Sequence, residues 1–183
     1  MIVGVTGTIG AGKGTVVEHL VQEKGFAHYS VRDFLCEELV RRGLPLDRDS
    51  MRETANALRA EHEPAYIITT LYERAEASGS DALIESVRAL GEAEFLKEHG
   101  VKLLAVDAKR RIRFDRIIAR GSSTDHIDFD TFVAQEEKEL SSDDPFGQNI
   151  LGVMQMADCR IENNGTLEEL YQRIEQVLPE LRS

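Results

Sequence analysis

The sequence predicts an α/β fold in which helices cover both faces of a parallel sheet. Short apolar runs alternate along the chain with segments of helical periodicity. The first apolar run, 2–6, also leads through a glycine-rich turn into a helical segment, the order of a strand, a turn and a helix. With 183 residues the chain is long enough for one well-packed domain, so we expect residues 1–183 to form one.

The elements follow from the period of the apolar residues. A helix is expected from about Thr15, after the glycine-rich turn, and a last amphipathic helix follows Gly165-Thr166 and ends near Leu178. The strand-like runs are 2–6, 27–29, 82–85, 102–106 and 159–162. Two longer helical excursions lie between strands: 31–78, with breaks at 43–49 and at Pro64, and a basic helix at 109–120 that is followed by the polar stretch 121–128 and another helix.

Composition excludes several classes of function. The formal net charge of -11 argues against broad binding of nucleic acid or of anionic membranes, because both depend on a basic surface. No apolar run is long enough to cross a bilayer, and the glycine-rich start leaves no room for a signal peptide, so we expect a cytoplasmic protein. Cys36 and Cys159 lack the spacing of a zinc site and are expected to be reduced thiols.

The turn after the first strand carries the clearest chemical signal. It reads Gly7-Thr8-Ile9-Gly10-Ala11-Gly12-Lys13-Gly14-Thr15. Its glycines allow successive backbone amides to point inward around phosphate oxygens, and the following helix adds a partial positive charge at its N-terminus. Lys13 is placed as a point charge over the terminal phosphates, and the Thr15 hydroxyl near phosphate or magnesium-bound water. The segment therefore predicts ATP with Mg²⁺ as ligand, the alternative being a tight glycine turn without one.

The Gly12-Lys13-Gly14-Thr15 ending resembles the nucleoside monophosphate kinase group of P-loop proteins, and the whole chain is similar to small adenylate-kinase-related nucleotide kinases of archaea. The matching stretches are 7–15, 30–33, 42–44 with 56–59, 84–88 with Glu92, and 157–158 with 164–170. The resemblance implies a three-layer P-loop kinase fold with a five-stranded sheet in the order 2-3-1-4-5. It also implies an acceptor-binding segment at 31–78 and a lid at 109–150.

The same resemblance implies roles for individual residues. Lys13, Arg88, Arg116 and Arg120 would be catalytic, with Arg88 on the acceptor phosphate and the other two arginines in the lid. Glu85, where the group usually has aspartate, would hold magnesium together with Thr15, since hard cations prefer oxygen ligands. Asn164-Gly165 would lie under the adenine ring. Surface side chains of a strand end or of a basic helix remain the alternative for the charged residues, and a simple turn for Asn164-Gly165.

The acceptor is less well defined by the sequence. Cys36 stands where the group carries an arginine for the monophosphate, and neutral sulfur cannot replace a guanidinium on phosphate. The returning helix of the lid has one positive and three negative residues at 135–139, where further arginines are typical. The candidates for holding the acceptor are Arg32, Asp33, Arg41, Arg52, Arg59 and Arg88.

Three interpretations follow. The first is ATP- and Mg²⁺-dependent phosphoryl transfer to a nucleoside or deoxynucleoside monophosphate. The second keeps the reaction but uses another small-molecule acceptor, such as the ribose hydroxyl of dephospho-coenzyme A. The third is an ATP-binding switch with weak hydrolysis, in which closure of the lid acts on a protein partner. Loss of the arginine at position 36 favours the third, whereas Lys13, Arg88, Arg116 and Arg120 count against it.

Overall fold

The computed structural model describes residues 1–121, 128–142, 144 and 146–183. Its centre is a five-stranded parallel sheet in the order β2-β3-β1-β4-β5. The strands are β1 (Ile2–Gly7), β2 (Ala27–Ser30), β3 (Ala82–Glu85), β4 (Lys102–Asp107) and β5 (Cys159–Glu162). The predicted fold class, strand positions and strand order are confirmed.

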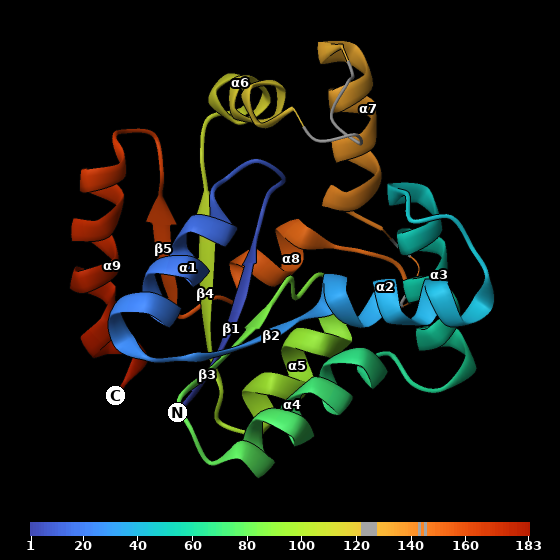
Figure 1. Ribbon diagram of the computed structural model, residues 1–183, viewed down its shortest axis with the longest axis horizontal. Coiled ribbons are helices and arrows are strands. Elements are labelled where there is room, and N and C mark those ends of the chain that lie inside the picture. The colour runs from blue at the N-terminus through green and yellow to red at the C-terminus, as the bar shows by residue number, and fades with distance from the viewer. Residues whose placement is uncertain (122–127, 143, 145) are drawn as a thin grey trace.

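The described helices connect these strands and flank the sheet (Figure 1). They are α1 (Lys13–Lys24), α2 (Val31–Arg42), α3 (Arg48–Glu61), α4 (Tyr66–Ser78), α5 (Leu90–Glu98), α6 (Arg110–Arg120), α7 (Phe129–Leu140), α8 (Ile150–Gln155) and α9 (Leu167–Leu181). None of them is long and apolar enough to span a bilayer.

Two apolar clusters lie on opposite faces of the sheet, because successive side chains of a strand point to opposite sides. In β3, Leu83 joins the cluster under α1 and α9, whereas Ile84 joins the cluster under α2 to α5. β4 divides in the same way, with Leu104 on the first side and Leu103 on the second. Helices therefore cover both faces, and the structure has the three layers that the sequence predicts.

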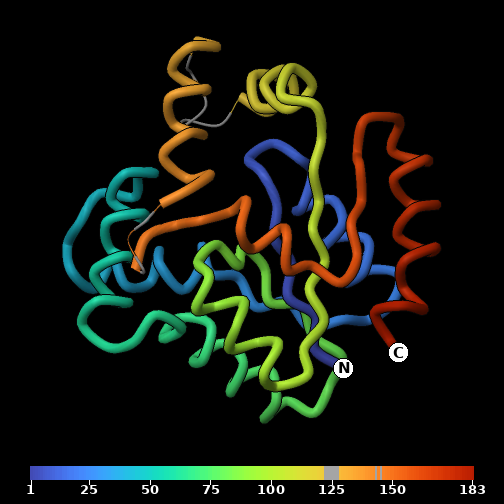
Figure 2. Tube along the Cα trace, turned by 180° about the vertical axis from the view of Figure 1, so that it is seen from behind, coloured from blue at the N-terminus to red at the C-terminus, as the bar shows by residue number. Residues whose placement is uncertain are grey.

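Helices of both excursions lie near the carboxyl ends of the strands, whereas α4 of the first excursion packs against one face of the sheet. Figures 1 and 2 show α2 and α3 beside one part of this edge and α6 and α7 above it, with the turn between β1 and α1 below α6. A hydrogen bond of 2.9 Å from Arg48 in α3 to Gln135 in α7 joins the two excursions. Ligands of open parallel sheets bind at this edge, so these helices are placed to surround one.

The ends of some elements differ from the prediction. α1 begins at Lys13 rather than Thr15, because Gly12 already has a left-handed backbone and acts as the N-cap. α9 continues past Pro179 to Leu181, whose side chain is buried against α1 and the sheet. The short helix α8 is not predicted, and most of the polar stretch 121–128, at residues 122–127, lies outside the described part of the chain.

Candidate functional site

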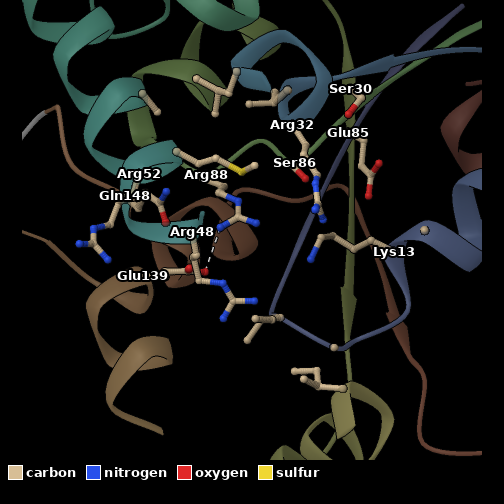
Figure 3. A pocket seen from close by; sticks show the side chains of 18 of the residues that line it. Lys13, Ser30, Arg32, Arg48, Arg52, Glu85, Ser86, Arg88, Glu139 and Gln148 are labelled. Atoms are coloured by element: carbon tan, nitrogen blue, oxygen red, sulfur yellow. Dashed lines mark hydrogen bonds and ion pairs between the residues drawn. The ribbon is translucent and has the colours of Figure 1, made fainter. Parts of the chain in front are cut away.

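A cavity of about 690 Å³ lies over the carboxyl ends of the strands (Figure 3). It is bounded by the glycine-rich loop and by side chains from α2, α3, α6 and α7. Eight basic and three acidic side chains line it among the described residues. The basic ones are Lys13, Arg32, Arg48, Arg52, Arg59, Arg88, Arg116 and Arg120, and the acidic ones are Glu18, Glu85 and Glu139. In a chain with a net charge of -11, this excess of positive charge marks the cavity as a site for an anion.

Several glycines shape the glycine-rich loop through backbone angles that other residues rarely adopt, and Gly7 and Gly12 show this most clearly. Gly7 has a φ of 140° and Gly12 a φ of 97°, both in the left-handed range. A Cβ at Gly7 would collide with the carbonyl group of Val106, and one at Gly12 with the side-chain amide of Asn163. The sequence therefore places glycine where both the dihedral angle and the available space require it.

Lys13 lies folded back over this loop. Its Nζ donates hydrogen bonds of 2.9 Å to the carbonyl oxygens of Gly7 and Thr8. Burial is the main cause that lowers the pKa of Lys13 to about 8, and the charge of Arg88 acts in the same direction, whereas Glu85 raises it. An anion beside the ammonium group would favour its charged form.

Asn163 supports the loop from below and is a functional candidate that the sequence analysis missed. Its side chain is 6 % exposed, and its Nδ2 donates to the carbonyl oxygen of Ala11 at 2.8 Å. The backbone oxygen of Asn163 accepts a hydrogen bond from Arg116 at 3.0 Å, so the lid helix and the phosphate loop meet at this residue. One feature of the sequence could have indicated this role. Asn163 directly follows a predicted strand, and ligands of parallel sheets bind where the strands end.

Thr15 and Glu85 both line the cavity and are chemically suited to magnesium. Magnesium is commonly held by one or two carboxylates together with substrate phosphates and water, so a hydroxyl and one carboxylate form a sufficient protein contribution. The Nε2 atom of His28 lies 3.0 Å from Oε2 of Glu85. Burial acts to raise the pKa of Glu85, but His28 and the charge of Lys13 outweigh burial and lower it. Glu85 is therefore held in its anionic form.

Arg88 is positioned by a strained turn at the end of β3. Ser86 is a non-glycine residue with a φ of 75°, and the amides of Ser86 and Val87 both donate to the carbonyl oxygen of Val5, at 2.9 and 3.1 Å. Strain of this kind collects at functional sites. The turn brings the guanidinium of Arg88 into the cavity, where its Nη1 donates to Glu139 at 2.9 Å.

Three other arginines that were predicted to hold the acceptor also line the cavity, and they differ in burial and in their ion-pair partners. Arg32 lines the cavity and has no ion-pair partner among the described residues, and Figure 3 shows its guanidinium near Lys13. Arg52 also lines it and pairs with Asp49 at 2.7 Å. Arg59 borders the cavity too, but its side chain is 1 % exposed and is paired with the fully buried Glu92 at 2.7 Å.

Two buried acidic residues of α7, Glu136 and Glu139, act as partners for arginines. Glu136 pairs with Arg113, which also donates to the carbonyl oxygen of Ile9 in the phosphate loop at 3.1 Å. Glu139 pairs with Arg88, as described above. The resemblance predicts further arginines at 135–139, where this chain has acidic residues. Two of these residues, Glu136 and Glu139, instead connect α7 to the phosphate loop and to the acceptor side of the cavity.

Seven predicted ligand residues do not line the cavity, of which three, Gly7, Thr8 and Ala11, belong to the glycine-rich loop itself. Arg41 is exposed and pairs with Glu38 at 2.6 Å, and Asp33 lies in the first turn of α2, where its amide donates to Ser30. Asn164 accepts a hydrogen bond of 2.7 Å from the amide of Lys109, and Gly165 follows it. The structure thus brings together Lys13, Thr15, Glu85, Arg88, Arg116 and Arg120, together with the loop glycines 10, 12 and 14. The residues outside the cavity lining are Gly7, Thr8, Ala11, Asp33, Arg41, Asn164 and Gly165.

Comparison with known proteins is consistent with this geometry. The AAA domain family matches residues 3–146. The chain is 33% identical to the UPF0200 protein of Pyrobaculum aerophilum, over 99% of this chain and 98% of that protein. The chain belongs to the AAA domain family and to the UPF0200 proteins. It is also 33% identical to the UPF0200 protein of Thermococcus kodakarensis, over 100% of this chain and 99% of the relative.

This UPF0200 fold recurs among solved structures. TT1252 from Thermus thermophilus superposes with a TM-score of 0.62 at 23% identity, covering 99% of this chain and 97% of that chain. Shikimate kinase from Acinetobacter baumannii gives 0.60 at 17% identity, covering 98% and 93%. A gluconokinase from Sinorhizobium meliloti gives 0.61 at 16% identity, covering 98% and 91%. At these identities the likeness establishes the P-loop kinase fold.

Proposed function

We propose that this protein transfers a phosphoryl group from ATP, with magnesium, to a nucleoside or deoxynucleoside monophosphate. The observation that carries the proposal is the cavity itself, because eight basic side chains of the described residues line it beside the glycine-rich loop in an acidic protein. Such a concentration of positive charge is suited to two phosphate-bearing ligands. The relation to adenylate kinases implied by the sequence is part of this proposal, as are one domain over 1–183, an acceptor segment at 31–78 and a lid at 109–150.

The donor would bind at the loop. Its phosphates would lie against the backbone amides of residues 7–15 and the ammonium group of Lys13. Thr15 and Glu85 would hold magnesium, which when bound would neutralise charge on the phosphates. Arg116 and Arg120 of α6 border the cavity. Arg116 would cover the ATP base or reach its phosphates, and Arg120 would stabilise charge on the group in transfer.

The acceptor would bind between α2, α3 and the β3 turn. Arg32, Arg52 and Arg88 approach this space from three different elements, and Val31, Leu35, Met51 and Ala55 provide an apolar wall. A nucleotide combines an anionic phosphate with a flat apolar base, so it matches both kinds of surface. Phosphoryl transfer depends mainly on positioning and charge neutralisation, so no dedicated general base is needed.

A second candidate is a small acceptor that carries a hydroxyl group. Two acceptor-side arginines, Arg59 and Arg88, already have carboxylate partners in Glu92 and Glu139, which lowers the charge available for an acceptor phosphate. The shared fold with shikimate kinase and gluconokinase also supports this candidate. Dephospho-coenzyme A, with its ribose hydroxyl, belongs to the same class.

Transfer of labelled γ-phosphate from ATP tests these candidates. The acceptors are the ribo- and deoxynucleoside monophosphates, dephospho-coenzyme A, shikimate and gluconate, each with magnesium, and Lys13→Ala is the inactive control. A labelled nucleotide supports the first candidate, and a label only on a hydroxyl compound replaces it with the second. Slow release of free phosphate with every acceptor would contradict both, and would favour a nucleotide switch with a protein partner.

A further inference from the structure

Gln148 has an unsatisfied polar atom in the wall of the cavity. The residue lines the cavity and is 7% exposed, and its Oε1 has no hydrogen-bond partner among the described residues. A buried carbonyl oxygen without a partner is costly, and most native proteins avoid one. The atom is therefore placed to accept a hydrogen bond from a molecule that enters the cavity.

The backbone around Gln148 is held from both sides. The amide of Asn149 donates to the carbonyl oxygen of Arg88 at 2.8 Å, and the Asn149 side chain caps α8 by accepting from Gly152 at 2.9 Å. On the other side, the carbonyl oxygen of Phe146 accepts from the buried guanidinium of Arg59 at 3.5 Å. These contacts fix the backbone at Gln148 relative to Arg88 and Arg59.

The position of Gln148 indicates which part of a ligand it would meet. In Figure 3, Arg88 lies between Lys13 and Gln148, so Gln148 is on the far side of Arg88 from the phosphate loop. The wall formed by Val31, Leu35, Met51 and Ala55 borders the same cavity. An acceptor phosphate held near Arg88 and Lys13 would direct the rest of the acceptor toward this apolar wall and the amide of Gln148.

We propose that Gln148 recognises the base of the acceptor nucleotide and determines base preference. Its Oε1 accepts a hydrogen bond from an N–H group of the base, while the same carboxamide can donate to a neighbouring ring nitrogen or carbonyl oxygen. An amide paired with adjacent donor and acceptor atoms is an established way to read a base edge. The inference rests on the proposed function and names the recognition element within that site.

The test compares wild-type protein with Gln148→Met, which keeps the length of the side chain but removes its hydrogen bonds. Gln155→Met, on the exposed side of α8, is the matched control. Binding is measured by calorimetry at a saturating level of a non-hydrolysable ATP analogue. The probes are the eight common ribo- and deoxynucleoside monophosphates, with ribose 5-phosphate as the ligand that lacks a base.

At least one nucleotide is expected to bind wild-type protein about tenfold or more tightly than ribose 5-phosphate, and Gln148→Met should reduce that ratio by about tenfold. The affinity for ribose 5-phosphate itself should not change, which a general loss of structure would not produce. An unchanged ratio in Gln148→Met, or a wild-type protein that binds nucleotides no better than ribose 5-phosphate, overturns the inference.

The γ-phosphate transfer assay on the same proteins separates this inference from the proposed function. If the wild-type protein phosphorylates a nucleotide and Gln148→Met keeps the same relative KM values among the bases, the inference is wrong and the proposed function stands. If the base preference depends on Gln148 but no nucleotide is phosphorylated, the proposed function is wrong and Gln148 remains the recognition element.

Discussion

The carboxylate of Glu139 accepts a hydrogen bond of 2.9 Å from the guanidinium of Arg88, across 51 residues of sequence. The Glu139 side chain is only 5% exposed, so the pair is poorly screened by water. The resemblance to nucleoside monophosphate kinases predicts that Arg88 contacts the acceptor phosphate. In this structure an internal carboxylate occupies that guanidinium, and an incoming phosphate would have to compete with it or share it.

Glu139→Gln should therefore strengthen acceptor binding. Removal of the competing negative charge leaves Arg88 available to a phosphate, and we expect an increase in monophosphate affinity of roughly three- to tenfold. Calorimetric titration with the acceptor found by the transfer assay measures it. Glu137→Gln makes the same change of charge on the exposed side of α7 and should have little effect. Weaker binding in Glu139→Gln alone would mean that Glu139 orients Arg88 instead of competing for it.

ATP affinity should fall as the pH rises above about 8. Because burial lowers the pKa of Lys13 from 10.5 to about 8, the ammonium group loses its proton in the free protein above that pH. Bound phosphates favour the charged form, so binding requires proton uptake in this range, and the affinity should fall by at most about tenfold per pH unit. Fluorescence titration with a labelled ATP analogue from pH 7 to 10 measures the dependence.

Lys13→Met is the control for this titration. It should bind ATP more weakly at pH 7 and should lose the dependence between pH 8 and 10, because the titrating group is gone. An affinity of the wild-type protein that does not change between pH 8 and 10 would contradict the prediction. A pH dependence that persists in Lys13→Met would mean that another group titrates.

Gly12→Ala should destabilise the fold, whereas Gly14→Ala should not. A side chain at Gly12 meets the Asn163 amide and requires a φ of 97°, and strain of this kind costs about 1–3 kcal/mol. At Gly14 a Cβ has no heavy atom within 4 Å and the residue lies in α1, so alanine there should leave the free energy of unfolding unchanged or raise it by up to about 1 kcal/mol. Urea denaturation of both variants provides the comparison. Equal free energies of unfolding would contradict the requirement for glycine at position 12.

Arg59→Met should be strongly destabilising, because it leaves the carboxylate of Glu92 buried without its charged partner. Side-chain exposure in this pair is 1% and 0%, and breaking such a pair costs about 3–5 kcal/mol. Arg41→Met removes an arginine that is 72% exposed and should leave stability nearly unchanged, because water screens its ion pair. Thermal denaturation in the absence of ligand distinguishes the two. A folded Arg59→Met protein of wild-type stability that binds the acceptor poorly would instead make Arg59 a direct ligand.

Much of the fold could be predicted from local patterns. The apolar runs, the breaks at 43–49 and Pro64 and the glycine-rich turn depend on properties of neighbouring residues, and they predict the strands, the helical excursions and the phosphate loop correctly. The ends of helices were less predictable: Gly12 caps α1 through its backbone angle, and α9 passes Pro179 because Leu181 is buried against the core. These details depend on tertiary packing.

By itself, the sequence determined the order of the elements and the lysine and hydroxyl of the phosphate loop, because residue type and local spacing are sufficient to produce them. The pairing of β1 with β3 brings the carboxylate of Glu85 beside that loop. Only the tertiary structure decided the partners of the charged residues. Two contacts join segments that are far apart in the chain: the ion pair of Glu139 with Arg88, and the hydrogen bond from Asn163 to the phosphate loop. The burial of the Gln148 amide without a hydrogen-bond partner for its Oε1 also appears only in the folded structure. The physical reason is that burial and charge pairing are properties of a folded arrangement, to which distant segments contribute and which no local window of sequence contains.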